Sequence, residues 1–283
     1  MKAPAFDYTK PRSMVEVFAL LQRHGADARL LAGGQTLLAT LNMRLSEPAL
    51  LIDLTGLAAL RAIGVEGQVL SIGALATHSE VERSELVARH APLLAMAVPY
   101  IGHRAIRNRG TFGGSIAYAD PAAEWPACLA ALDGTVVAQG PGGERRIPAR
   151  DFFRGLYQTA LRADEVLAAC ELPCTQPNDW FAFDELARRH GDYAIVGLAA
   201  AARRDGRALR SPRFAFLGAA ATPLRATRTE ALLDGRALDQ AAIDAALGCI
   251  KSELDPPADP VHSSAAKRHL ASVLLKRVLE KAR

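Results

Sequence analysis

The stretch RGTFGGSIAYADPAAEWP, from Arg109 to Pro126, contains two adjacent glycines, Gly113 and Gly114. A second pair, Gly33 and Gly34, lies upstream in the segment LLAGGQTLLATL. Glycine lets the backbone take positive φ and lets a ligand approach main-chain N–H groups closely. Where a helix starts just beyond such a turn, the N–H groups form a site for an anion. Two such turns, brought together, would hold the two phosphates of a dinucleotide from opposite sides.

Neither pair has the spacing of a standard nucleotide-binding motif. The GxGxxG pattern of Rossmann folds does not fit, and neither does the phosphate loop, in which GxxxxGK is followed by Ser or Thr. Taken alone, each pair is explained at least as well by an ordinary structural turn. The neighbouring residues favour an anion site, because an apolar segment leads into the first pair and a helical segment begins at Thr36. The hydroxyls of Thr111 and Ser115 flank the second pair.

Length, composition and charge exclude several classes of protein. The chain has 283 residues, of which 50% are hydrophobic and 23% are charged, enough for a sizeable core in one large domain or two ordinary ones. Its net charge is +4, and the 34 basic residues are spread along the chain, which argues against nucleic-acid binding. No apolar stretch reaches the roughly 18 residues of a membrane span, and no secretory signal is visible. We therefore expect a cytoplasmic protein with no membrane span.

The four cysteines do not form a CxxC pair. The two closest lie in CELPC, which ends at Cys174 and has a proline before that residue. Reduced structural thiols explain this pattern better than a metal or iron–sulfur site does. We expect neither a metal site nor a cluster in this chain.

Helix and strand signals divide the chain near residue 176. Ser13 and Glu16 fit a helix capping box, and Gly25 fits the end of that helix. The segment CTQPND has the composition of a linker, and three strand-like segments after it precede three helical ones, which indicates a separate α+β domain. Up to the boundary we expect strands at 28–32, 48–54 and 164–173, hairpins at 60–74 and 135–148, and helices at 36–45, 79–90, 92–101 and 121–132. Beyond it we expect strands at 180–186, 193–202 and 213–220, and helices at 228–235, 238–250 and 263–282.

Three ordered stretches carry a family resemblance: ARLLAGGQTLLATLNMRLSEPALLIDL, IRNRGTFGGSIAYADPAAEWPA and FDELARRHGDYAIVGLAAAARR. Together they resemble the FAD-binding medium subunit of the molybdenum hydroxylases, the family of the carbon monoxide dehydrogenase flavoprotein and the xanthine dehydrogenase FAD domain. The resemblance covers the whole chain. It implies an FAD-binding fold of the vanillyl-alcohol oxidase type, with α/β subdomains at about 1–55 and 56–176. A C-terminal α+β domain with a small antiparallel sheet and helices would follow at 177–283.

The resemblance also implies the cofactor site. The two glycine turns would clasp the FAD pyrophosphate, and Glu124 matches an acidic residue that hydrogen-bonds the cofactor. Asp192 and Tyr193 match residues that bring the C-terminal domain onto the isoalloxazine ring. The second motif is more often TIGGN in the family, so Ser115 has less reach than the usual Asn. The full set of implied FAD-binding residues is Leu31, Ala32, Gly33, Gly34, Gln35, Thr36, Ile101, Thr111, Phe112, Gly113, Gly114, Ser115, Glu124, Leu161, Asp192 and Tyr193.

The function implied by the resemblance is electron transfer, with no catalytic residue and no metal in this chain. Substrate would be hydroxylated at a molybdopterin-type molybdenum cofactor in a large partner subunit. Electrons would pass through two [2Fe-2S] clusters of a small partner subunit to FAD and then to an external acceptor. The complex would be a heterotrimer, single or doubled, with the doubled form favoured. Carbon monoxide, purines, nicotinate-like rings, other N-heterocycles and aldehydes all remain open as the substrate, and an aromatic N-heterocycle is favoured among them. Quinone, cytochrome, oxygen and NAD all remain open as the acceptor.

Two other functions remain open from the sequence. One is a stand-alone FAD-dependent oxidase or dehydrogenase of the same fold, although 283 residues leave little room for a substrate domain and no general base stands out. The other is a non-enzymatic nucleotide-binding protein. His78 is expected at the surface, at the start of a helix. The roles of His103, Arg104, Arg107 and Arg109, around the second glycine pair, are left open.

Overall fold

Helix α1 (Met14–His24) begins where the sequence predicts, in a computed structural model that describes residues 2–283. The Ser13 hydroxyl accepts a hydrogen bond from the Glu16 N–H over 3.3 Å. The Glu16 carboxylate accepts from the Arg12 N–H over 2.8 Å instead of from Ser13, so half of the predicted capping box forms. Gly25 ends the helix with φ 51°, as predicted.

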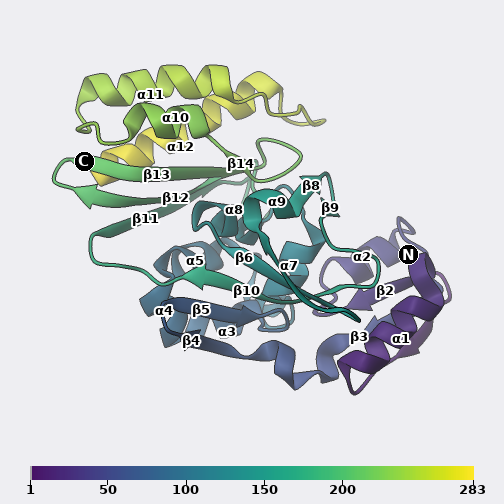
Figure 1. Cartoon of the computed structure of the whole chain (residues 1–283). Coiled ribbons are helices and arrows are strands. Elements are labelled where there is room, and N and C mark those ends of the chain that lie inside the picture. Colours follow the sequence, from purple (N-terminus) through teal and green to yellow (C-terminus); the bar gives the residue numbers. More distant parts are fainter. Residues whose placement is uncertain (1) are drawn as a thin grey trace.

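The first sixty residues form a small parallel sheet at one corner of the molecule (Figure 1). Its strand order is β1-β3-β2, and parallel neighbours require crossover connections, which α1 and α2 supply. Every residue of β3 is buried, as expected for the central strand of a parallel sheet. The elements are β1 (Asp7–Thr9), β2 (Ala28–Leu31), α2 (Leu37–Asn42) and β3 (Leu50–Asp53), with short 3-10 turns at η1 (Gly25–Asp27), η2 (Leu54–Gly56) and η3 (Ala58–Arg61).

A five-stranded antiparallel sheet follows, in the order β4-β5-β10-β6-β7. The two predicted hairpins form its sides, and the first turns at Gly67 with φ 57°. The last strand, β10, inserts between the hairpins and pairs with β5 and β6, so residues about a hundred positions apart become neighbours. The strands are β4 (Ile63–Glu66), β5 (Val69–Gly73), β6 (Thr135–Gly140), β7 (Gly143–Pro148) and β10 (Val166–Pro173).

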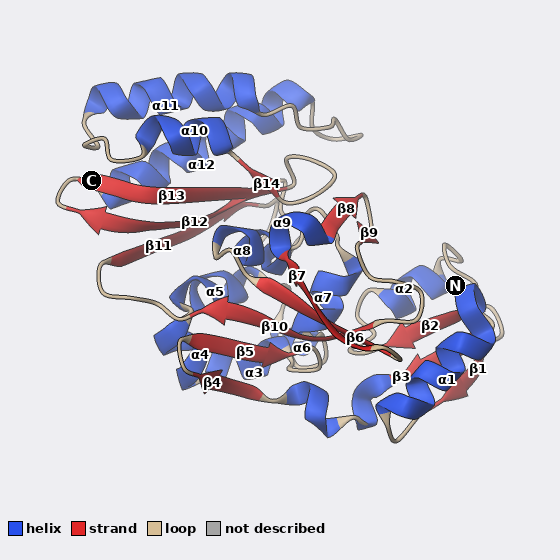
Figure 2. Cartoon of the chain, in the orientation of Figure 1, coloured by secondary structure: helices blue, strands red, loops and turns tan. Residues whose placement is uncertain are grey.

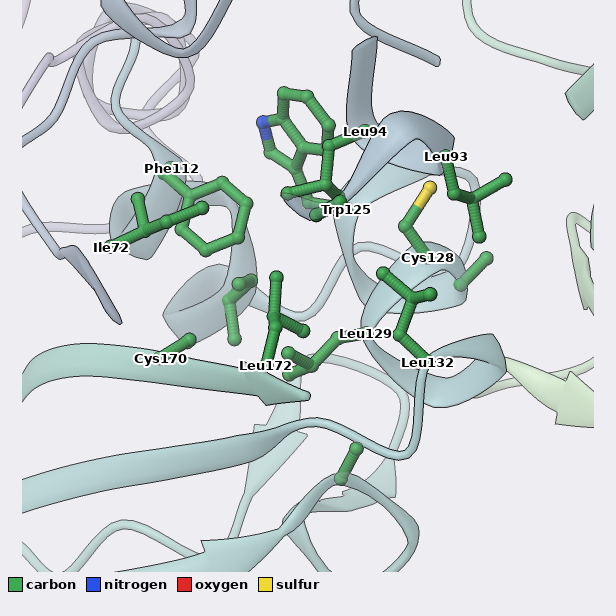
Figure 3. Packing of buried hydrophobic residues seen from close by; sticks show 14 of the residues in the cluster. Ile72, Leu93, Leu94, Phe112, Trp125, Cys128, Leu129, Leu132, Cys170 and Leu172 are labelled. Atoms are coloured by element: carbon green, nitrogen blue, oxygen red, sulfur yellow. The ribbon is translucent and has the colours of Figure 1, made fainter. Parts of the chain in front are cut away.

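Short helices pack beside this sheet and build the largest core (Figure 3). All eight residues of α8 are buried, and its Trp125 packs against Phe112, with Leu94 of α5 next to it in Figure 3. The helices are α3 (His78–Arg83), α4 (Glu85–His90), α5 (Pro92–Ala97), η4 (Val98–Tyr100), α6 (Arg104–Arg107), α7 (Phe112–Tyr118), α8 (Glu124–Ala131) and α9 (Ala149–Phe152). A two-stranded ribbon, β8 (Phe153–Gly155) with β9 (Gln158–Thr159), completes this part.

The C-terminal part has its strands before its helices, which confirms the predicted α+β architecture (Figure 2). Helices α10, α11 and α12 lie over one face of the sheet β11-β12-β13-β14, and α8 packs against β12 and β13. Because both faces are covered, the run Val196–Ala202 in β12 is buried throughout. The elements are β11 (Asp179–Leu186), β12 (Val196–Asp205), β13 (Ala208–Leu217), β14 (Leu224–Arg225), α10 (Thr227–Leu233), α11 (Gln240–Glu253) and α12 (Ser264–Ala282).

Two arginines of the C-terminal sheet bind the C-terminal end of α8. Arg213 Nε donates to the Ala131 carbonyl over 2.7 Å, and Arg225 Nη1 donates to the Ala130 carbonyl over 3.0 Å. Both guanidinium groups also contact Asp133, at 3.2 and 3.0 Å. Cations at the C-terminal end of a helix compensate its unsatisfied carbonyls and its dipole. These bonds therefore tie the C-terminal sheet to the helix that carries Glu124.

None of the helices in residues 2–283 is long and apolar enough to cross a membrane.

Candidate functional site

The first glycine turn presents unused main-chain donors. It lies between β2 and α2, and Gly34 has φ 72°. Within residues 2–283, no hydrogen bond uses the N–H groups of Gly33, Gly34, Gln35 or Thr36 as donors. The Gln35 side chain instead donates to the Gly33 carbonyl over 3.1 Å, which holds the turn closed. Backbone N–H groups without a partner need water or a ligand, and four in succession suit a phosphate.

The second glycine turn is built differently. The N–H groups of Phe112 and Gly113 donate to the carbonyls of Ala76 and Ala74, over 2.8 and 2.9 Å. The Gly114 N–H donates to the Thr111 hydroxyl, which caps α7, over 3.1 Å. The expectation that both turns offer free N–H groups therefore holds for the first turn only. Pairing with the segment before α3 satisfies the amides of Phe112 and Gly113, and the Thr111 hydroxyl, on a residue only 5% exposed, satisfies that of Gly114. Ser115 is partly exposed.

The two turns touch each other. A β-carbon on Gly33 would collide with the Arg109 carbonyl oxygen and lie 2.7 Å from the Gly110 Cα. A β-carbon on Gly114 would lie 3.7 Å from the Ala32 Cβ. Glycine is required at Gly33 because backbone from the second turn occupies the space of its side chain. The two touching turns, with the four free amides of the first turn, form a cradle of main-chain donors that suits a phosphate.

Gly113 has a different role from the one its motif suggests. A β-carbon there would collide with Ala74, at the end of β5. Phe112 is fully buried and packs on Trp125, with ring centroids 5.2 Å apart. Both residues therefore anchor the second turn to the core, while Gly114 next to them lies beside Ala32 of the first turn.

A loop of the C-terminal part reaches this cradle. Gly191 has φ 84°, and a β-carbon on it would lie 3.0 Å from the Gly102 carbonyl carbon. Two residues later, the Tyr193 side chain is 64% exposed. Partial desolvation and the Asp120 charge raise the pKa of Tyr193, and a hydrogen bond with Thr36 opposes that rise. The fold thus places Tyr193 beside Thr36 of the first turn and Gly191 beside Gly102.

Tyr118 and Tyr157 belong to this cluster and were missed from the sequence. Their rings meet edge to face, with centroids 5.1 Å apart. Asp120 raises the pKa of Tyr118, Tyr157 and Tyr193, although desolvation is the larger cause for each. A signal for Tyr118 was present, because it follows Ser115 by three residues and so shares its face of α7.

Two buried carboxyls lie where α8 meets the C-terminal sheet. Burial, reinforced by the Asp120 charge, raises the pKa of Glu124 to about 7. Burial, followed by the charges of Glu124 and Asp184, raises the pKa of Glu185 to about 8. The Glu185 Oε2 atom is buried and has no hydrogen-bond partner among residues 2–283. Both groups can therefore hold a proton near neutral pH. A signal for Glu185 was present in the sequence, because alternation along β11 places it on the same face as Phe181 and Phe183.

The structure also places the other residues that the sequence analysis singled out. Leu161 is partly buried at the edge of the main core, and Asp192 is exposed in the loop before Tyr193. The expectation of a surface position for His78 is wrong, because its side chain is 5% exposed. Arg107 is structural: it pairs with Glu82 at 3.1 Å and donates to the carbonyls of Ile101 and Gly102. His103, Arg104 and Arg109 are exposed.

The four cysteines, Cys128, Cys170, Cys174 and Cys249, are free thiols. In the part of the chain from residue 2 onward, no three His, Cys, Asp or Glu residues are grouped so that they could hold a metal ion.

Comparison with known proteins identifies two consecutive family domains. Residues 4–175 match the FAD binding domain in molybdopterin dehydrogenase, and residues 181–282 match the CO dehydrogenase flavoprotein C-terminal domain. The chain is 38% identical to the 6-hydroxypseudooxynicotine dehydrogenase complex subunit alpha of Paenarthrobacter nicotinovorans, over 100% of this chain and 96% of that protein.

Solved structures of the same length share the fold. A chain of the carbon monoxide dehydrogenase from Hydrogenophaga pseudoflava, in a form that lacks the Mo-pyranopterin moiety of the molybdenum cofactor, superposes with a TM-score of 0.97 at 37% identity. A chain of quinoline 2-oxidoreductase from Pseudomonas putida 86 superposes with a TM-score of 0.94 at 38% identity. Each match covers 100% of this chain and 98% of the other.

Proposed function

Since the chain belongs to the family of FAD-binding medium subunits of the molybdenum hydroxylases, we propose that it is the electron-transfer subunit of a three-subunit complex of this kind. The observation that supports this most directly is the pair of touching turns, where four free N–H groups of residues 33–36 lie beside the second turn. FAD, when bound, can accept one or two electrons and pass them on. The work of this chain is to bind, orient and shield that cofactor.

The residues implied by the resemblance take distinct roles in this proposal. The free amides of Gly33 to Thr36 and the hydroxyls of Thr111 and Ser115 hold the pyrophosphate. Tyr193 covers one face of the isoalloxazine ring, and Glu124 holds a proton beside the cofactor. We also propose that the FAD-binding domain ends near residue 176, between β10 and β11, which begins at Asp179.

The proposed partners are a large subunit with the molybdenum cofactor and a small subunit with two [2Fe-2S] clusters, in a doubled heterotrimer. Support comes from the relative that is named as a subunit of a dehydrogenase complex. We propose that electrons reach FAD from the small subunit and leave to an external acceptor. An aromatic N-heterocycle is proposed as the substrate of the whole complex, because two similar proteins are named for a pyridine compound and for quinoline.

Selective removal of FAD from the purified complex tests the electron path. We expect the flavin-depleted complex to lose reduction of its acceptor while it still oxidises substrate with an artificial dye that takes electrons upstream. Re-addition of FAD should restore the lost activity. Equal loss of both activities would place the flavin at the substrate-oxidising step and support a stand-alone oxidase or dehydrogenase. A colourless chain without partners would support a non-enzymatic protein.

A further inference from the structure

His78 is a buried polar residue directly behind the second glycine turn. It is the first residue of α3, where Thr77 and Glu80 form a complete capping box. The His78 N–H donates to the Gly110 carbonyl over 2.9 Å, and Thr77 forms an isolated antiparallel bridge with Thr111. The backbone at His78 is therefore held against the start of the second turn.

The imidazole ring of His78 lies against Gly110 itself. A β-carbon on Gly110 would come 2.7 Å from His78 Nε2 and 2.8 Å from Cδ2, so the ring edge occupies that space. Gly33 meets the Cα of the same residue, 2.7 Å from its own β-carbon position. Gly110 therefore lies between the His78 ring and Gly33. Because the ring blocks the side of Gly110 that faces away from Gly33, it limits how far the second turn can move away from the first.

Trp125 fixes the orientation of this ring. Its indole Nε1 donates to His78 Nδ1 over 2.9 Å, and both side chains are buried. Since an indole N–H can only donate, His78 Nδ1 carries no proton and the neutral ring has its proton on Nε2. Burial, together with the Arg107 charge, lowers the pKa of His78 to about 4, which keeps the ring neutral at physiological pH. Trp125 also packs on Phe112 of the second turn (Figure 3).

We propose that His78 and Trp125 are positioning residues, which hold the second glycine turn against the first and so preform the cofactor cradle. A preformed cradle does not have to be ordered when the ligand binds, and its affinity is higher for that reason. Neither residue contacts the cradle's free amides, so their effect on FAD is indirect. The inference rests on the proposed role of the two turns in FAD binding.

The test compares FAD affinity with stability in the full chain, purified with its partner subunits. His78→Phe keeps a ring but removes the acceptor, and Trp125→Phe keeps an aromatic side chain but removes the donor. Each leaves a buried polar group unpaired, and we expect about tenfold weaker FAD binding in each variant. The double variant should bind FAD about as tightly as whichever single variant has the lower affinity, because both substitutions break the same hydrogen bond.

Thr229→Val is the matched control. Thr229 is fully buried in the C-terminal part, and its hydroxyl donates to Glu253 over 2.7 Å, so the variant also loses a buried hydrogen bond. It should lower the melting temperature without changing the dissociation constant of FAD. If His78→Phe and Trp125→Phe also change only the melting temperature, the positioning role is wrong. If the wild-type protein itself does not bind FAD, the proposed function fails, and this inference fails with it.

Discussion

Gly33 and Arg109 leave no room for a side chain between them, because a β-carbon on Gly33 would collide with the Arg109 carbonyl oxygen. Gly33 lies in the connection between β2 and α2, and Arg109 lies in the connection between α6 and α7. Contact between them closes the cradle and sets the spacing of its donors. The cradle is thus a property of two turns together, and each turn alone would be an ordinary bend.

Gly33→Val should give a preparation without bound flavin. The added side chain forces the two turns apart, because the atoms that it meets are backbone and cannot rotate away. Gly113→Val should have the same result, since its side chain would collide with Ala74 and displace the second turn. Flavin absorbance per folded chain measures the effect.

Gly64→Val serves as the control for both variants. No atom lies within 4 Å of a β-carbon placed on Gly64, which is in β4, away from the turns. This variant should keep its flavin. Full flavin content in the Gly33 and Gly113 variants would contradict the two-turn cradle.

Glu185 should make the stability of the chain fall as the pH rises. Its pKa is about 8 in the folded chain and 4.5 ordinarily, so between these values the folded state keeps a proton that the unfolded state has lost. Stability therefore declines over this window by up to about 1.4 kcal/mol per pH unit, and the full loss is reached above pH 8. Glu185→Gln removes this dependence, because the amide is neutral throughout. Urea unfolding at several pH values should show a difference between variant and wild type that grows from pH 5 to 8, and a constant difference would contradict the assignment.

Tyr193→Ala should weaken FAD retention, shift the flavin absorbance and speed the reaction of reduced flavin with oxygen. An aromatic ring on one face of the flavin contributes about 0.5–1.5 kcal/mol beyond its buried area and keeps solvent from that face. Tyr193→Phe is the matched variant, since it keeps the ring and removes only the hydroxyl that lies near Thr36. We expect it to behave nearly as wild type. If Tyr193→Ala lowers the melting temperature but leaves the flavin properties unchanged, Tyr193 serves only to pack the C-terminal part against the rest of the chain.

Arg225→Met should destabilise the chain more than Arg213→Met does. Arg225 pairs with the buried Glu230 at 2.6 Å, and its removal leaves that carboxylate without its cation. We expect a loss of about 2–3 kcal/mol for Arg225→Met and about 1 kcal/mol for Arg213→Met, measured by urea unfolding. Arg210→Met, from an exposed pair with Asp205, should cost less than about 0.5 kcal/mol. Equal losses of stability in all three variants would argue against a stabilising role for the contacts of Arg213 and Arg225.

Local chemistry explains why so many elements were predictable. The cap at Ser13, the helix end at Gly25 and the hairpin turn at Gly67 each depend on a few adjacent residues. The order of strands and helices after residue 176 also follows from local patterns, and it predicted the α+β character of the C-terminal part. The prediction of a capping box was only half right, because the Glu16 carboxylate accepts from the Arg12 N–H and not from the Ser13 N–H.

The sequence by itself therefore determined most of the longer helices and strands, the two glycine turns and, through its motifs, the family. It did not predict the short elements β1, α6, α7 and β14, and the expected helix at 79–90 is divided at Ser84 into α3 and α4. Only the tertiary structure decided which donors the turns leave free, because the pairing of the second turn with residues 74–78 joins segments about 35 positions apart. It likewise buried His78 behind Gly110 and placed Glu185 near Glu124 across the two parts of the chain. Local patterns carry no information on which distant segment lies opposite, and packing of the whole core settles that choice.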